Sequence, residues 1–214
     1  MIAAIAKPTT RDRLIETARE LFLRNGYTAT GVAQILRVSD TRSGSLYFHF
    51  PTKEDLLLAV LDRYKELLWP EVMQPVFDRI DDPIERIFGV LDGYRQMLTA
   101  TKCALGCPIG NLALELSDTH PAARQKITEN FDGWKAVIKQ WLDDASGRLP
   151  EHTNTAELAA FVLTVMEGAM MQAKAHRSLD PFDSAVTQLR EYVDRLLADG
   201  SDWTSPKQTI NSSE

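Results

Sequence analysis

The residues with the most obvious capacity for covalent or metal chemistry are two cysteines and four histidines. Cys103 and Cys107 are spaced C-x3-C, and the histidines are His49, His120, His152 and His176. A cysteine nucleophile needs a base and an orienting group within hydrogen-bond reach, and no histidine forms a known motif with either cysteine. Metal binding through Cys103, Cys107 and His120 lacks a fourth ligand and fits no standard zinc spacing. We therefore predict no catalytic residue, no metal site, no cofactor and no enzymatic activity.

A second group of functional side chains lies in the stretch RSGSLYFHFPTK, from Arg42 to Lys53. Arginine can bond guanine O6 and N7 with two hydrogen bonds, and serine hydroxyls can bond base edges or phosphates. The hydroxyl of Tyr47 and the imidazole of His49 can hold phosphates. The stretch therefore favours binding to double-stranded DNA over catalysis.

The charge distribution is consistent with DNA binding by the N-terminal part of the chain alone. The net charge is −6, but residues 1–53 carry eight basic and four acidic side chains, a balance of +4. Residues 54–214 carry 16 basic and 26 acidic side chains, a balance of −10. A basic head on an acidic body is expected when only the head contacts phosphate.

The composition indicates a soluble globular protein, with 44% apolar and 25% charged residues. The apolar start MIAAIAKP is too short for a signal segment, and no uncharged stretch reaches the ~18 residues of a membrane helix. Two cysteines are too few for a disulfide scaffold. We expect a cytoplasmic protein without a membrane partner.

Apolar residues recur with helical period along nearly the whole chain, which predicts an all-α fold. A first helix starts at Thr9-Thr10 and stops at Asn25-Gly26, and Thr30 is expected to cap a short second helix. A turn at Ser39-Asp40-Thr41 then leads to a third helix over about 42–48. Two short helices packed across a first helix form a helix-turn-helix, whose second member enters the major groove.

The fourth helix is expected to start at Thr52, with Asp55 completing a capping box. Lys53 then lies where its ammonium and the free helix amides can act on one phosphate. For the aromatic residues, the alternative is a packed cluster inside the head. The candidate DNA contacts are Thr30, Thr41, Arg42, Ser43, Gly44, Ser45, Tyr47, Phe48, His49 and Lys53.

Residues 10–61 resemble the DNA-binding domain of the tetracycline-repressor (TetR) family. The resemblance is carried by ELFLRNGYTATGVAQI and SGSLYFHFPTKEDLL. It implies an all-helical homodimer, a repressor that leaves its DNA when a C-terminal domain binds a small molecule. Asp40-Thr41 stands where the family has glycine and a small apolar residue, and aspartate tolerates the left-handed backbone this turn requires.

We predict four segments. They are a helix-turn-helix DNA-binding domain over 1–53, a linking helix over 53–69, a ligand-binding and dimerisation domain over 70–199, and a disordered tail over 200–214. The last two helices are expected to form the homodimer, because 158–175 is apolar on more than one face. Phe182, Val186, Leu189, Val193 and Leu196 repeat like an interhelical seam. The alternative is that these helices pack only within one chain. A dimer predicts a palindromic operator.

The body is expected to hold a small-molecule inducer among residues that face one another from its long helices. Core packing is the alternative for each of them, and Glu167 is either a pocket carboxylate or a surface group near the dimer edge. The candidates are Tyr94, Met97, Leu98, Cys107, Asn111, Leu114, Phe131, Trp134, Ile138, Met166, Glu167 and Met170.

The segment CALGCPIGNLALEL, residues 103–116, resembles one found in a branch of the family in which some members sense electrophiles or oxidants through a thiol. Cys107 precedes a proline and opens a helix, where free amides would lower its pKa. Thiol-based sensing through Cys107 is therefore the alternative to ligand sensing. The other possibility is that this cysteine is only a small buried hydrophobe.

Overall fold

The computed structural model describes residues 8–202, which contain helices and no strand, so the predicted all-α fold is confirmed. The expectations for the apolar start and the tail fall mostly on residues 1–7 and 203–214, which lie outside the described part. The head consists of α1 (Thr10–Asn25), α2 (Val32–Ser39) and α3 (Ser43–His49), and α4 (Lys53–Leu67) leads out of it. The body contains η1 (Leu68–Met73), α5 (Gln74–Phe77), α6 (Pro83–Ala100), α7 (Pro108–Leu116), α8 (Pro121–Asp144), η2 (Ser146–Arg148), α9 (Thr155–His176) and α10 (Asp180–Asp202).

The first helix starts and stops where local sequence signals predict. The Thr9 side chain accepts from the Asp12 N–H at 3.1 Å, and Asp12 accepts from the Thr9 N–H in return, which completes a capping box. At the other end Gly26 has φ 84°, a conformation that favours glycine, and its N–H donates to the Phe22 carbonyl. Between these ends, one apolar face of α1 is buried in the head.

The turn between α2 and α3 has the left-handed residue expected of it, since Asp40 has φ 49° and ψ 49°. The predicted cap of α2 is wrong. Gly31 occupies the cap position without a side-chain bond, and the Thr30 hydroxyl instead donates to the Gly26 carbonyl at 2.7 Å. Thr30 therefore closes the α1–α2 connection from inside.

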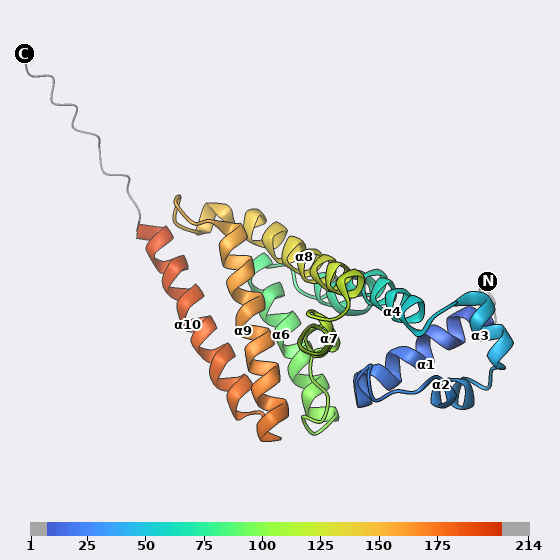
Figure 1. Cartoon of the computed structure of the whole chain (residues 1–214). Helices are drawn as coiled ribbons and strands as arrows, with labels where there is room; N and C mark the ends of the chain where they lie inside the picture. Colours follow the sequence, from blue (N-terminus) through green and yellow to red (C-terminus); the bar gives the residue numbers. More distant parts are fainter. Residues whose placement is uncertain (1–7, 203–214) are drawn as a thin grey trace, which may run out of the picture.

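Helix α4 joins the head to the body, packing against α1 on one side and α8 on the other (Figure 1). Its predicted start is confirmed, because the Thr52 side chain accepts from the Asp55 N–H at 3.1 Å and Asp55 accepts from the Thr52 N–H. Pro70 lacks an N–H for a regular helical bond, and the chain continues there as the π-helical turn η1. This turn forms part of the wall of the cavity described below.

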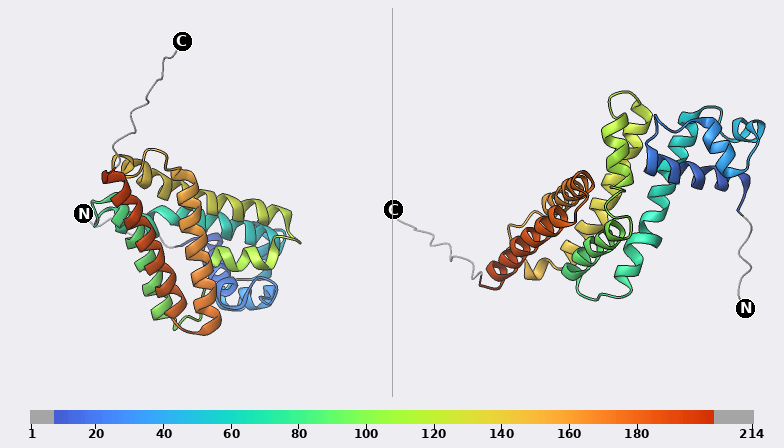
Figure 2. Two further views of the ribbon diagram at one scale, coloured as in Figure 1. Left: turned by 90° about the vertical axis from the view of Figure 1, so that its left-hand side faces the viewer. Right: turned by 90° about the horizontal axis from the view of Figure 1, so that it is seen from below.

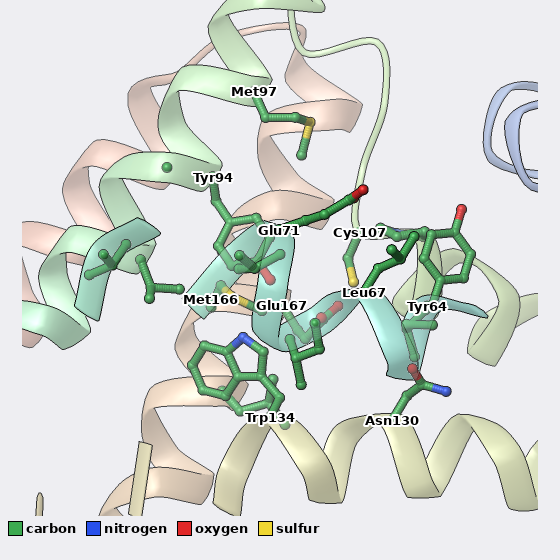
Figure 3. Close-up of a pocket in the computed structure, with 18 of the residues that line it drawn as sticks. Tyr64, Leu67, Glu71, Tyr94, Met97, Cys107, Asn130, Trp134, Met166 and Glu167 are labelled. Carbon is green, nitrogen blue, oxygen red and sulfur yellow. The ribbon is translucent and has the colours of Figure 1, made fainter. Parts of the chain in front are cut away.

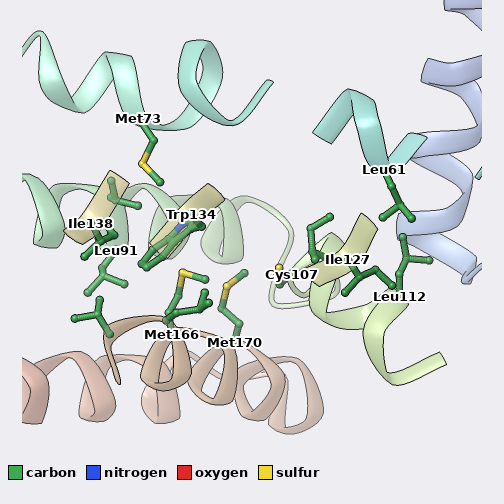
Figure 4. Packing of buried hydrophobic residues seen from close by; sticks show 14 of the residues in the cluster. Leu61, Met73, Leu91, Cys107, Leu112, Ile127, Trp134, Ile138, Met166 and Met170 are labelled. Carbon is green, nitrogen blue, oxygen red and sulfur yellow. The ribbon is translucent and has the colours of Figure 1, made fainter. Parts of the chain in front are cut away.

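The core of the body is built where α6, α8 and α9 face one another. Figure 4 shows Leu91, Trp134, Ile138 and Met166 pointing towards a common centre, with Met73 of η1 above them. Trp134 and Ile138 belong to α8, which packs on α9 and crosses it in the left view of Figure 2. The cavity wall and the core are thus made by the same helices.

The apolar repeat of α10 is used within the chain. Phe182, Leu189 and Val193 are buried against the rest of the body, and α10 packs on α9 along its length. Arg190 adds a bidentate bond to Glu85 of α6, at 2.5 and 2.8 Å. The alternative of intramolecular packing therefore holds for these three residues of the repeat.

The sequence predicts that a disordered C-terminal tail starts at residue 200, which is too early. Helix α10 extends to Asp202, so Gly200 is helical, and residues 203–214 lie outside the described part. Within the described residues, α9 has the length and apolar composition of a membrane-spanning helix. Part of its apolar surface is buried by packing on α8 and α10, whereas Phe161 and Met171 remain exposed.

Candidate nucleic-acid interface and ligand cavity

The short helix α3 turns one apolar face inward and presents its remaining face to solvent. Leu46 and Phe50 are buried and anchor the helix, as predicted from the sequence. Ser43, Gly44 and Ser45 are exposed in its first turn, and no atom lies within 4 Å of the position that a Cβ on Gly44 would take. A backbone this open can approach a base or a phosphate closely.

The arginine and aromatic residues around α3 are also accessible. Arg42 occupies the position before the helix and is exposed, and Tyr47 is half-exposed. Phe48 is 83% exposed, and its ring meets the His49 ring at 5.0 Å between centroids. The half-buried His49 also contacts the ring of the buried Phe50, at 6.3 Å, whereas Tyr47 and Phe48 are open to a partner. An exposed aromatic surface of this kind usually meets a partner.

Three of the predicted DNA contacts, Thr30, Thr41 and Lys53, make hydrogen bonds within the protein, and only Thr30 lacks an exposed surface. Thr30 is 0% exposed, so the expectation that it touches DNA is corrected. The Thr41 hydroxyl donates to the Ser39 carbonyl at 3.2 Å and is half-buried. Lys53 Nζ donates to the Tyr27 carbonyl at 2.6 Å and lies 4.1 Å from the Tyr27 ring centroid. Lys53 retains two further N–H groups for a phosphate.

One residue of the body, Glu115 in α7, bonds directly to the head and was missed in the sequence interpretation. Its carboxylate accepts from the Tyr27 N–H at 2.9 Å and from the Thr28 N–H at 2.6 Å. Partial burial raises its pKa, but these bonds and the nearby Lys53 hold the pKa of Glu115 below its ordinary value. His120 packs edge-on against the Tyr27 ring, at 5.3 Å. The head and α7 are therefore linked through the α1–α2 turn.

The body encloses a cavity of about 470 Å³ and, beside it, a wider groove of about 950 Å³. The cavity is lined by residues of α1, α4, η1, α5, α6, α8 and α9 and by the start of α7, and Figure 3 shows Tyr94, Trp134, Met166 and Glu167 around it. The groove lies between α7, α8 and α9. Cys107 and Glu167 line both hollows, so the two meet at this pair.

Most of the predicted ligand residues line one of these hollows. The cavity is lined by Tyr94, Met97, Cys107, Phe131, Trp134, Met166 and Glu167. The groove is lined by Cys107, Asn111, Leu114, Phe131 and Glu167. Leu98, Ile138 and Met170 are fully buried and line neither hollow, which corrects their assignment. They fill the core behind the cavity wall.

The sequence interpretation missed the wall that α4 and η1 contribute. Tyr64 and Leu67, which were assigned to a simple linking helix over 53–69, line the cavity, and so does Glu71, which was not among the ligand candidates. The available signal was Pro70, since a proline in the middle of a helical pattern indicates a kink and kinks leave room between helices.

The environment of Cys107 is opposite to the one expected from its helix-start position. The thiol caps α7 and accepts from the Gly110 N–H at 3.4 Å, as a helix-start residue can. Burial nevertheless raises the pKa of Cys107 well above its usual value, and the Glu167 carboxylate raises it further. The expected lowered pKa is therefore wrong, because burial outweighs the helix amides.

Glu167 reaches the cavity across a glycine. A Cβ at Gly110 would overlap Glu167 Oε2, so any larger residue there would displace the carboxylate. Burial raises the pKa of Glu167. Three buried polar atoms around the hollows have no protein partner, and they are Glu167 Oε1, Trp134 Nε1 and Asn111 Nδ2. Buried polar groups are normally bonded, so these atoms offer hydrogen-bonding positions to a molecule inside the hollows.

No three histidine, cysteine or acidic side chains gather in a way that could hold a metal within residues 8–202. His120 contacts Tyr27 at the head, whereas Cys107 lies at the opposite end of α7. The three residues considered for a metal site therefore serve separate contacts.

Two family models match the chain and together span both of its parts. Residues 14–60 match the model for bacterial regulatory proteins of the tetR family. Residues 83–188 match the model for the C-terminal domain of LmrA/YxaF-like transcriptional regulators. The chain belongs to the TetR family. It is therefore a DNA-binding transcriptional regulator of the helix-turn-helix type.

Relatives of this TetR-family regulator match over nearly their whole length. The transcriptional repressor DhaR of Mycobacterium sp. is 26% identical over 87% of this chain and 93% of its own. The regulator LmrA of Bacillus subtilis is 27% identical over 80% of this chain and 89% of its own. The crystal structure of the reduced form of E. coli NemR superposes with a TM-score of 0.75, at 25% identity, over 86% of this chain and 96% of that one.

Proposed function

We propose that this TetR-family regulator is a homodimeric repressor, released from a palindromic operator when a small molecule enters the body cavity. The observation that carries the proposal is the continuous path along α7. Its cap residue Cys107 and its first residues Pro108 and Ile109 line the cavity, and its last turn carries Glu115 on the head. A ligand that moves the start of α7 also moves the bonds to Tyr27 and Thr28.

The DNA side of the proposal uses the exposed face of α3. Arg42 reads a guanine, and Ser43 and Ser45 bond a base edge or a phosphate. Tyr47 and His49 contact the phosphate backbone on either side. The domain division proposed from the sequence is kept, with the head up to residue 53 and the sensing and dimerisation body over 70–199.

The dimer is proposed to form through the outward face of α9 together with α10. Along α9 the residues that face away from the core are spaced 3, 4, 3 and 4, and they are Phe161, Thr164, Gly168, Met171 and Ala175. This spacing is typical of a helix–helix seam. Phe161 and Tyr192 of α10, each 44% exposed, already pack edge to face at 5.6 Å. A second copy would cover this apolar face.

Repression, rather than activation, is favoured by the relative DhaR, which is named a transcriptional repressor. It matches this chain across both head and body, including the cavity-forming helices.

Selection of bound duplexes from a random pool tests the proposal directly. We expect purified protein to enrich an inverted repeat, with affinity that falls steeply as salt rises because phosphate contacts release counterions. A single unpaired half-site would contradict the dimer. Weak binding without any enriched sequence would contradict an operator-specific regulator.

Thiol-based sensing through Cys107 is the second candidate. It is favoured by the place of the thiol at the meeting point of both hollows and by the similarity to NemR, whose structure is described as a reduced form. Because the pKa of Cys107 is raised, the thiol would react mainly with electrophiles that the cavity holds against it.

Operator release by N-ethylmaleimide tests this candidate, with Cys103→Ser as the matched control. Cys103 is also buried, but it lies before α7 and lines neither hollow. Thiol sensing predicts that Cys107→Ser abolishes release and that Cys103→Ser does not. Release that persists in Cys107→Ser would end the candidate.

A further inference from the structure

The Glu167 carboxylate is buried at the cavity without a charged partner. Oε1 has no hydrogen-bond partner among the described residues, and the neighbouring polar group that acts on the carboxyl is the Cys107 thiol. Lys174, two turns further along α9, donates to Asn111 Oδ1 at 3.1 Å instead. A buried carboxylate without a partner is costly, so a ligand donor at Oε1 would be stabilising.

The wall that faces this carboxylate is aromatic and presents an N–H group. Figure 3 shows Tyr94 and Trp134 beside Glu167, with Tyr64 towards the α4 side. Trp134 is 4% exposed, and its Nε1 has no partner with hydrogen-bond geometry although it points towards Tyr94. Ring faces around a cavity favour a flat ring, by stacked or edge-on contact.

The charges around the cavity disfavour an anion near Glu167. Glu71 provides a second carboxylate in the lining. Arg19 also lines the cavity, but it bonds Glu16 at 2.7 Å and lies over the Tyr64 ring. Arg79 lies at an exposed part of the lining, in the connection after α5. A carboxylate ligand beside Glu167 would place two like charges in a poorly hydrated site.

We propose that the cavity binds an aromatic molecule without negative charge, whose N–H or O–H group donates to Glu167 while its ring lies against Tyr94 and Trp134. The proposal rests on the proposed function in one respect, because such a molecule would be the inducer. A cationic amine and a neutral N–H or O–H compound share this chemistry.

Calorimetric titration with three acridines of the same ring size tells apart binding of a cation, of a neutral donor and of an anion. 9-Aminoacridine is a cation with N–H donors, acridone is neutral with one N–H and one carbonyl, and acridine-9-carboxylate is an anion. We expect at least one of the two donors to bind about tenfold or more tightly than the anion. Equal or tighter binding of the anion would overturn the proposal.

Two substitutions of Glu167 separate charge from hydrogen bonding. Glu167→Gln keeps the size and an acceptor, so it should weaken 9-aminoacridine about tenfold and acridone about threefold or less. Glu167→Leu removes the acceptor and should weaken both donors. Glu157→Gln, on an exposed position of the same helix, is the control. Unchanged dissociation constants in both Glu167 variants, with each protein still folded by circular dichroism, would overturn the proposal.

Measuring release of the protein from its operator tests separately which class of ligand the cavity binds and whether that ligand acts as an inducer. Acridone is the probe for this arm, because the 9-aminoacridine cation binds DNA itself. Binding of acridone that depends on Glu167 without release would leave the ligand class standing and contradict induced release. Release by anionic aromatic compounds that Glu167→Leu does not impair would contradict the ligand class and leave the proposed function standing.

Discussion

At the scale of single residues, burial decides the roles that residue types leave open. The sequence predicts correctly that Arg42 and the serines of α3 are exposed, because the helical period turns the apolar Leu46 inward and leaves the polar residues on the outer face. It could not predict the environment of Cys107, since the burial that raises its pKa most, and the Glu167 carboxylate that raises it further, both come from helices packed against it in the fold. It could not predict the buried bonds of Thr30 either, because Thr30 and the carbonyls it bonds meet only after α1 and α2 pack.

Substitutions of Thr30 and Arg42 should have opposite effects on stability and on DNA recognition. Thr30→Val keeps the shape but removes the hydroxyl that donates to two carbonyls, so urea unfolding should show a loss of about 1–3 kcal/mol. Arg42→Ala is exposed and should leave stability within about 0.5 kcal/mol. In operator binding, Arg42→Ala should relax the preference at one base pair by about 1–3 kcal/mol.

The opposite pattern would reverse these roles. A Thr30→Val protein with unchanged stability and altered base preference would return Thr30 to the DNA surface.

At the scale of elements, helix ends were predictable and helix partners were not. The two capping boxes, the Asn25-Gly26 stop and the prolines that open α6 and α8 all act within a few residues, so the chain carries them as local patterns. The apolar face of a helix, by contrast, can be recognised in the sequence, but the surface it packs against cannot. The stripe of α10 turned inward, and the kink after α4 opened the cavity that the sequence placed among later helices.

The hydrogen bonds of Glu115 join α7 to the head, and their removal should loosen the α1–α2 turn. Glu115→Ala removes both acceptors of the Tyr27 and Thr28 N–H groups. Hydrogen exchange at these two amides should become about tenfold faster, while amides in the middle of α8 are unchanged. Glu129→Ala, a partly exposed acid on the body surface, is the control. Exchange that does not respond to Glu115→Ala would remove α7 as the link between cavity and head.

The sign of the pH effect follows from the lowered pKa of Glu115. A carboxyl group whose pKa is lower in the folded than in the unfolded protein stabilises the fold at any pH above its unfolded pKa. This stabilisation is lost as the pH falls through the pKa of the folded state. The link is therefore complete at neutral pH and weakens only in acid. Protection of the Tyr27 and Thr28 amides should fall below about pH 4, and a transition near pH 7 would require another group.

At the scale of the whole molecule, the head and α10 lie at opposite ends (Figure 1). Two copies joined through α9 and α10 would therefore meet at one end of each body and carry their heads at the other. Each head alone contacts few phosphates, so strong operator binding needs both heads on one duplex. In the proposed dimer, the outward apolar face of α9 offers the surface that brings the two copies together.

The molecule-scale prediction places a charge on that face. Phe161→Glu should convert the dimer to a monomer in sedimentation equilibrium, because a buried unpaired carboxylate costs several kcal/mol at an interface. Operator affinity should then fall, and its dependence on log salt should become about half as steep because one head is lost. Phe77→Glu, at a similarly exposed aromatic of α5, is the control and should remain dimeric. A protein that stays dimeric with Phe161→Glu but dissociates with Phe77→Glu would move the interface to the α5 surface, and the two heads would have to be placed anew.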